Sequence, residues 1–124
     1  MPLTLSTLPA AFKNAWSGIL RFFRLERNGK IQGLVAVLAI SGGIWLKISR
    51  LELALVILCC GGVIGLEMLN SAVEKLCDFV QPDHDPRIGF VKDVAAGAVL
   101  WASIASAVAG GMIFLPYLLA WWGR

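Results

Sequence analysis

The chain has 124 residues, of which 58% are apolar and only 15% are charged, and its mean hydropathy is +0.77. Soluble domains typically contain about 45–50% apolar and about 25% charged residues, so both departures indicate a membrane protein. The composition excludes a disordered chain, a coiled coil and a secreted disulfide scaffold. A net charge of +3, scattered along the chain, is too small for a nucleic-acid-binding surface, so no nucleic acid is expected as a partner.

The N-terminal region predicts an amphipathic surface helix over about residues 6–29. Apolar residues recur mostly at helical spacing from Phe12 to Phe23, with basic residues between them. Aromatic rings on one side and cations on the other suit a membrane–water interface, although a short helix packed on the rest of the protein is the alternative. Pro9 suits the first turn of this helix, with Ser6 or Thr7 as its cap.

Three uncharged runs predict three membrane-spanning helices, at about residues 31–48, 51–80 and 88–116. The runs cover residues 33–46, 53–66 and 94–123. Residues 31–46 would rise about 24 Å as a helix, less than the ~30 Å hydrocarbon core, so this span needs a turn from its flanks. Residues 81–86 carry the strongest turn signal, and Pro116 is expected to stop or kink the last helix. Three aromatic residues suit the far interface: Tyr117, Trp121 and Trp122.

Basic residues predict the orientation of these helices. Eight of the eleven lie in the N-terminal flank or around the loop between the second and third spans. The N-terminus and the 76–92 loop are therefore expected in the cytoplasm, and the C-terminus outside. A row of alanines in the last span and the Gly61–Gly65 pair would let helices approach closely, which favours a homo-oligomer. Packing within one chain is the alternative.

A polar stripe at the end of the second span predicts chemistry. At about 100° per residue, five side chains share an arc of about 100°: Glu67, Asn70, Ser71, Glu74 and Asp78. Three carboxylates on one face repel one another, and each charge at membrane depth costs about 2.5–3.5 kcal/mol. A divalent cation would relieve this cost, and oxygen ligands suit Mg²⁺, which takes one or two carboxylates and leaves another free as a base. Neighbouring cations or a proton relay are the alternatives.

Lys92 and Asp93 form a second candidate site at the start of the last span. Lysine is a point-charge partner for phosphate, whereas a lysine that reaches for the membrane interface is the alternative. His84 lies in a turn, where a solvated histidine is the more common case. The chain has no Walker A, GxGxxG or kinase HRD signature. The cysteines lack metal-ligand spacing and are expected to fill helix surfaces: Cys59, Cys60 and Cys77.

These motifs resemble the small prokaryotic integral-membrane diacylglycerol kinases and undecaprenol kinases. The resemblance rests on ExxNSAVExxxD at residues 67–78, on Lys92-Asp93 and on AAGAVL at residues 95–100. It extends to FxNAxxG at residues 12–18 and to ERN at residues 26–28, and it covers about residues 10–115. It implies a homotrimer of three-span subunits with a surface helix, in the bacterial inner membrane. It also implies transfer of the γ-phosphoryl group of ATP, with Mg²⁺ as cofactor, to a lipid hydroxyl.

The resemblance also implies roles for individual residues. Glu67 matches the general base, with Asn70 and Ser71 as supporting residues. Glu26 and Glu74 match the carboxylates that hold the metal and the triphosphate. The remaining matches are nucleotide contacts: Lys92, Asp93, Asp83, His84, Asp85 and, on the surface helix, Asn14. Some family members carry an acid six positions after the match to Glu26, where this chain has Gln32.

The resemblance leaves the lipid open between two candidates. Diacylglycerol, giving phosphatidic acid, is the first, and undecaprenol, giving undecaprenyl phosphate, is the alternative. Residues 26–28 and 95–100 look somewhat closer to the undecaprenol-type members. The rival from another class is a small proton-coupled exporter that uses Glu67 or Glu74, but an exporter has no use for a nucleotide cradle made by Glu26, Lys92 and Asp93.

Overall fold

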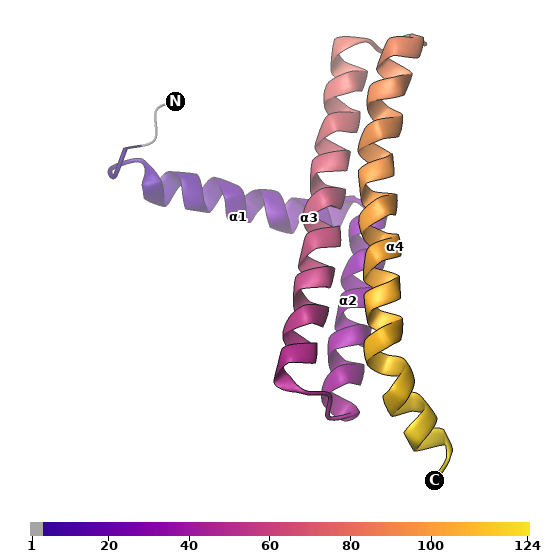
Figure 1. Cartoon of the computed structure of the whole chain (residues 1–124). Helices are drawn as coiled ribbons and strands as arrows, with labels where there is room; N and C mark the ends of the chain where they lie inside the picture. The colour runs from indigo at the N-terminus through magenta and orange to yellow at the C-terminus, as the bar shows by residue number, and fades with distance from the viewer. Residues whose placement is uncertain (1–3) are drawn as a thin grey trace.

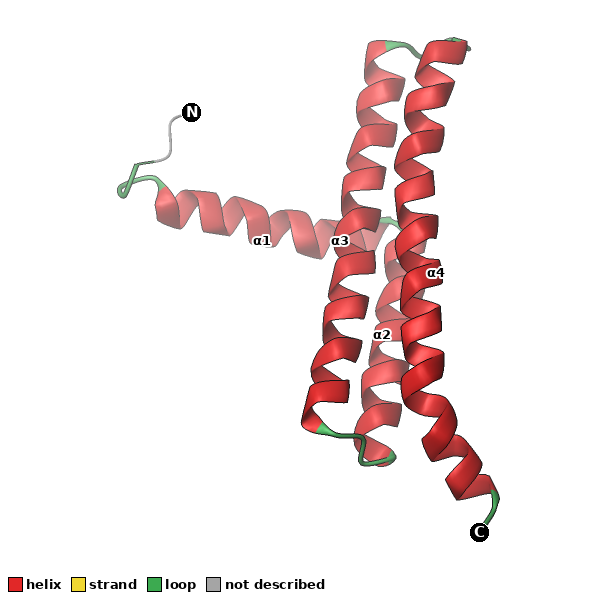
Figure 2. Ribbon diagram, in the orientation of Figure 1, coloured by secondary structure: helices red, strands yellow, loops and turns green. Residues whose placement is uncertain are grey.

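The computed structural model describes residues 4–124 as four helices: α1 (Leu8–Leu25), α2 (Arg27–Trp45), α3 (Arg50–Val80) and α4 (Pro86–Trp122). Helices α2, α3 and α4 lie side by side as a bundle, and α1 projects sideways from it (Figure 1). Short loops join the helices, and the described part of the chain contains no strand (Figure 2). The predicted all-α class is therefore confirmed.

Helix α1 begins near the predicted cap. Pro9 lies in the first turn of α1, as expected, and Thr7 occupies the cap position. The Thr7 side chain does not cap the helix, however, because its hydroxyl donates to the carbonyl oxygen of Thr4 at 3.0 Å. The start of α1 therefore has no side-chain N-cap hydrogen bond.

The corner between α1 and α2 is a single extended residue, Glu26, with φ −95° and ψ 126°. The predicted surface helix reaches about residue 29, and the next predicted helix begins at about residue 31. Instead, α1 ends at Leu25 and α2 begins at Arg27. No glycine or proline marks this corner in the sequence. The chain turns here because the buried Phe22 ring packs against the buried Gly29, which brings the two helices together.

Gly29 is expected to be intolerant of a side chain. A Cβ atom at this position would lie 2.8 Å from Cε2 of Phe22. Gly29→Ala should lower the thermal unfolding midpoint in detergent micelles, because such overpacking costs about 1–3 kcal/mol and alanine regains about 1 kcal/mol at most. Gly18→Ala in α1 is the control, since its Cβ would meet nothing within 4 Å. Equal midpoints for both variants would show that the ring contact does not hold the corner.

At the opposite end of the bundle, polar and aromatic contacts join the helices. Ser49 and Glu52 form a capping box at the start of α3, with hydrogen bonds of 3.1 and 2.9 Å. The Tyr117 hydroxyl on α4 donates to Oε1 of Glu52 at 2.5 Å. The rings of Trp45 and Trp121 pack edge to face with centroids 5.8 Å apart. Two of the three predicted interface aromatics therefore also connect helices.

Helix α4 does not stop at Pro116. It continues to Trp122 with the proline inside it. Its last turns lean away from the rest of the bundle, which fits the predicted kink and not the predicted stop (Figure 1). A proline ring clashes with the carbonyl one turn earlier, and the helix relieves the clash by bending.

Most long apolar side chains of the single chain are exposed. Among the described residues, the buried apolar side chains are Phe22, Ala36, Val56, Val63, Cys77 and Ile113. Helices α3 and α4 are both long and apolar enough to cross a membrane. Among the described helices α2 does not meet the same criteria, because Arg27, Asn28 and Lys30 at its start shorten its apolar part, so the predicted span over residues 31–48 stays a prediction. Such a surface is typical of a chain that is covered by lipid or by further subunits.

Candidate active site

Glu67 and Asn70 line a pocket of about 310 Å³ between α2, α3 and α4. Glu67 is only 3% exposed, and the other buried polar residue of the described chain is Ser71, at 8%. The polar walls of the pocket come from Asn28, Gln32 and Ser103. The residue that was matched to a general base is therefore buried, and the pocket that it lines has both neutral polar and apolar walls.

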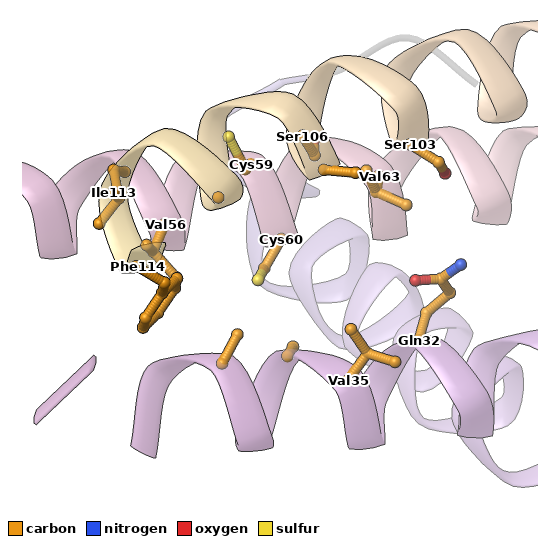
Figure 3. Close-up of a pocket in the computed structure, with 14 residues that line it drawn as sticks. Gln32, Val35, Val56, Cys59, Cys60, Val63, Ser103, Ser106, Ile113 and Phe114 are labelled. Carbon is orange, nitrogen blue, oxygen red and sulfur yellow. The ribbon is translucent and has the colours of Figure 1, made fainter. Parts of the chain in front are cut away.

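A second, apolar pocket of about 340 Å³ adjoins the first, and the two share Gln32 and Ser103. Gln32 lies at one end of this pocket, and Ile113 and Phe114 lie at the other (Figure 3). Valine, alanine and cysteine side chains of α2 and α3 form most of the wall between these ends. A polar end with a carboxylate and an apolar continuation suits a molecule that carries one hydroxyl group on a long chain.

An ion pair ties the corner between α1 and α2 to α3. Lys75 Nζ lies 2.5 Å from Oε1 of Glu26, 49 positions away in the chain. The side chain of Glu26 is 26% exposed and that of Lys75 is 71% exposed. One of the two predicted metal ligands is therefore held by a lysine beside the polar stripe of α3.

A second ion pair joins α3 to α4. Lys92 Nζ lies 2.5 Å from Oδ1 of Asp78. A cation of a neighbouring helix therefore holds one acid of the polar stripe, Asp78, as the alternative with neighbouring cations predicted. Glu67 and Glu74 take part in no ion pair among residues 4–124. The polar stripe runs from the buried Glu67 to the exposed Glu74 and Asp78, so neighbouring cations do not account for the whole of it.

Glu26 and Glu74 were predicted to hold a metal. Within the described residues there is no group of three or more His, Cys, Asp or Glu side chains that could hold an ion. This excludes a closed structural site of the zinc type within residues 4–124. Magnesium usually takes only one or two carboxylates and completes its shell with water and substrate phosphates. A magnesium site at Glu26 and Glu74 therefore stays a prediction.

Asp85 caps the start of α4. Its carboxylate accepts hydrogen bonds from the backbone N–H of Arg87 at 2.9 Å and from the Arg87 guanidinium at 3.2 and 2.8 Å. The Arg87 side chain and backbone hold the pKa of the Asp85 carboxyl below its usual range. This capping role is sufficient to explain an aspartate here, and an Asp-Pro pair before a helix is a sequence signal for it. The nucleotide contact stays a prediction for Asp85.

The other predicted nucleotide contacts are not brought together by the fold of the single chain. Asp83 and His84 lie exposed in the loop between α3 and α4, and Asp93 is exposed on the first turns of α4. Asn14 is exposed on α1. None of the four forms a hydrogen bond through its side chain within the described chain, and none lines either pocket.

Four pocket residues with amide or hydroxyl side chains were not predicted as site residues: Asn28, Gln32, Ser103 and Ser106. Gln32 was noted only as a departure from the family, and the structure places it where the two pockets meet. Ser103 is a polar residue inside a long uncharged run. Such a residue usually faces other helices, so its position could have been interpreted from the sequence. Asn28 belongs to the upstream motif, but its position was not interpreted.

Comparisons with known proteins identify the family of this chain. The family described as prokaryotic diacylglycerol kinase matches residues 13–114. The chain is 35% identical over 108 residues to undecaprenol kinase of Bacillus subtilis, which covers 87% of this chain and 88% of that protein. It is 35% identical over 114 residues to diacylglycerol kinase of Synechocystis, covering 91% and 65%. It is 28% identical over 94 residues to diacylglycerol kinase of Escherichia coli K12, covering 76% and 77%. The chain therefore belongs to the prokaryotic diacylglycerol kinase family, as its motifs predicted.

Proposed function

We propose that this lipid kinase transfers the γ-phosphoryl group of MgATP to the hydroxyl group of a lipid alcohol within the membrane. One observation carries the proposal: the buried Glu67 lies in a polar pocket that adjoins an apolar one. The apolar pocket offers space for a lipid chain, and the polar pocket offers a carboxylate for its hydroxyl group. Family membership supports the reaction class.

Glu67 is proposed as the general base. Phosphoryl transfer depends mainly on positioning and on neutralisation of charge, so the protein needs to remove only one proton from the lipid hydroxyl. The Asn70 amide lines the same pocket and can orient that hydroxyl by a hydrogen bond. Ser71 is buried one residue further along α3 and supports this part of the helix.

Glu26 and Glu74 are proposed to hold Mg²⁺ together with the triphosphate. When bound, the ion neutralises charge on the phosphate oxygens. Lys92 adds a cation, once its ammonium group is shared between Asp78 and a phosphate. Asp93, Asp83, His84, Asp85 and Asn14 are proposed as the remaining nucleotide contacts.

The proposed assembly is a homotrimer of three-span subunits in the bacterial inner membrane, with α1 as the surface helix. The sideways direction of α1, the apolar lengths of α3 and α4, and the exposed apolar side chains all support it. The N-terminus and the loop between α3 and α4 are proposed to face the cytoplasm, because eight of the eleven basic residues lie on that side. This orientation would place Glu26 and Glu74 where ATP is found.

The lipid is proposed to be diacylglycerol, with undecaprenol as the second candidate. The relatives from Synechocystis and Bacillus subtilis bear the names of both activities at the same identity of 35%. Both alcohols present one hydroxyl group above apolar chains, so the apolar pocket accepts either in principle. The proton-coupled exporter is not favoured, since the family is one of kinases.

A transfer assay is expected to show label in the lipid fraction. Purified protein in mixed micelles would receive labelled ATP, magnesium and either diacylglycerol or undecaprenol. The alcohol with the higher kcat/KM is the substrate, because kcat/KM measures discrimination between competing substrates. Omission of magnesium is the control and should abolish transfer. A protein that transfers no label to any lipid alcohol would contradict the proposed function.

A further inference from the structure

Lys75 occupies an unusual position beside the proposed metal pair. It directly follows Glu74 in α3, and its ammonium nitrogen lies 2.5 Å from Oε1 of Glu26. Apart from Arg50 in the first turn, it is the only basic residue of α3. Neither the family motif nor the proposed mechanism gives this lysine a function.

Because of this ion pair, the Lys75 ammonium group and a divalent metal ion would compete for the Glu26 carboxylate. When a carboxylate oxygen accepts a short, charge-assisted hydrogen bond from an ammonium group, that group already neutralises much of the carboxylate charge. Oε1 of Glu26 is therefore closed to a divalent cation until Lys75 has moved, and the nearby ammonium charge weakens the attraction of the whole carboxylate for such an ion. Lys75 has room to move, because its side chain is 71% exposed and its ammonium group sits on a flexible chain of four carbons. Glu26 is held more firmly, at 26% exposed and in the corner between two helices.

We infer that Lys75 is a built-in competitor for divalent cations at Glu26, an inference that rests on the proposed function of Glu26 and Glu74. Lys75 neutralises Glu26 in the nucleotide-free protein and lowers its affinity for a bare cation. A metal–nucleotide complex suffers less from this competition, because its phosphates offer the displaced ammonium group a new partner. Lys75 thus favours the metal–nucleotide complex over the free ion.

The test measures Mn²⁺ binding to the purified full chain in micelles without nucleotide, with free Mn²⁺ followed by electron paramagnetic resonance. Lys75→Met should bind Mn²⁺ about two- to fivefold more tightly than the unmodified protein, as expected for the loss of one exposed ion pair. Lys75→Arg keeps the cation and should restore the original affinity. If Lys75 instead positioned Glu26 for the metal, Lys75→Met would bind Mn²⁺ more weakly.

Two further variants separate the ion pair from general charge effects. Lys30→Met removes a cation about one turn after Glu26 that takes part in no ion pair among residues 4–124, so it should change the affinity less than Lys75→Met does. The double variant Glu26→Gln with Lys75→Met should bind no more tightly than Glu26→Gln alone, because the contested oxygen atom has lost its charge.

The outcomes distinguish this inference from the proposed function. An unchanged or weaker affinity of Lys75→Met, in a chain where Glu26→Gln weakens Mn²⁺ binding, would overturn the role of Lys75 and leave the metal pair intact. A Glu26→Gln protein that binds Mn²⁺ normally would remove Glu26 from the metal pair and overturn both. A gain in the double variant equal to that of Lys75→Met would also overturn the inference. Circular dichroism in micelles checks that each variant folds.

Discussion

Glu67→Gln is expected to lower kcat by about 10²–10⁴-fold while the apparent affinity for MgATP changes by less than about tenfold. The carboxylate takes the proton of the lipid hydroxyl, and an amide of nearly the same shape cannot. The nucleotide affinity should persist, because its proposed contacts at Glu26, Glu74 and Lys92 lie outside the pocket that holds Glu67. Steady-state rates with MgATP and lipid varied independently would separate the two quantities.

Glu52→Gln provides a matched control for this experiment. Glu52 lies at the other end of the same helix, where it caps α3 and binds Tyr117, so its loss should leave kcat unchanged. A Glu67→Gln protein with normal turnover would show that Glu67 is not the base. An inactive Glu67→Gln protein that no longer binds MgATP would instead place Glu67 among the metal ligands.

Glu74→Gln is expected to reduce activity by orders of magnitude, most strongly when magnesium is limiting. The change removes the charge of one proposed metal ligand and preserves its shape. Because Glu74 is exposed and in no ion pair within the described chain, folding should not change. The measurement is the rate as a function of magnesium concentration at a fixed concentration of ATP.

The Glu74→Gln and Glu67→Gln variants should differ in which kinetic constant changes. Loss of a metal ligand weakens MgATP binding itself, so KM for MgATP should rise in Glu74→Gln, whereas Glu67→Gln should mainly lower kcat. Excess magnesium should recover part of the lost rate only in Glu74→Gln. Near-normal turnover of Glu74→Gln at limiting magnesium would exclude Glu74 as a ligand.

Helices could be predicted from the sequence where one apolar run defines them. The second apolar segment was expected over residues 51–80, and α3 runs over Arg50–Val80, with a capping box at one end and a turn cluster at the other. The corner at Glu26 could not be predicted, because it depends on the packing of Phe22 against Gly29 rather than on a local helix-breaking residue. At Pro116 the sequence left a stop or a kink open, and helix α4 continues past the proline with a bend.

The candidate site could be predicted from the sequence only within one helix. Residues Glu67 to Asp78 share one face of α3 by helical geometry alone, so their stripe was visible. The Lys75–Glu26 pair joins residues 49 positions apart and depends on how α1 and α2 meet α3. The same holds for Gln32 and Ser103, which come from two different helices to the junction of the two pockets. Such partners follow from tertiary packing, which periodicity does not encode.

The large apolar surface of the chain determines how its stability can be measured. A water-soluble monomer of this length exposes about 6,500 Å² when folded, whereas this chain exposes 9,554 Å². Whatever covers the remainder, detergent, lipid or a second subunit, binds the folded chain and so contributes to its free energy of unfolding. That free energy belongs jointly to the protein and its surroundings. Variants can therefore be compared only at one fixed detergent-to-protein ratio, and a shift in thermal midpoint between two detergents says nothing about the chain alone.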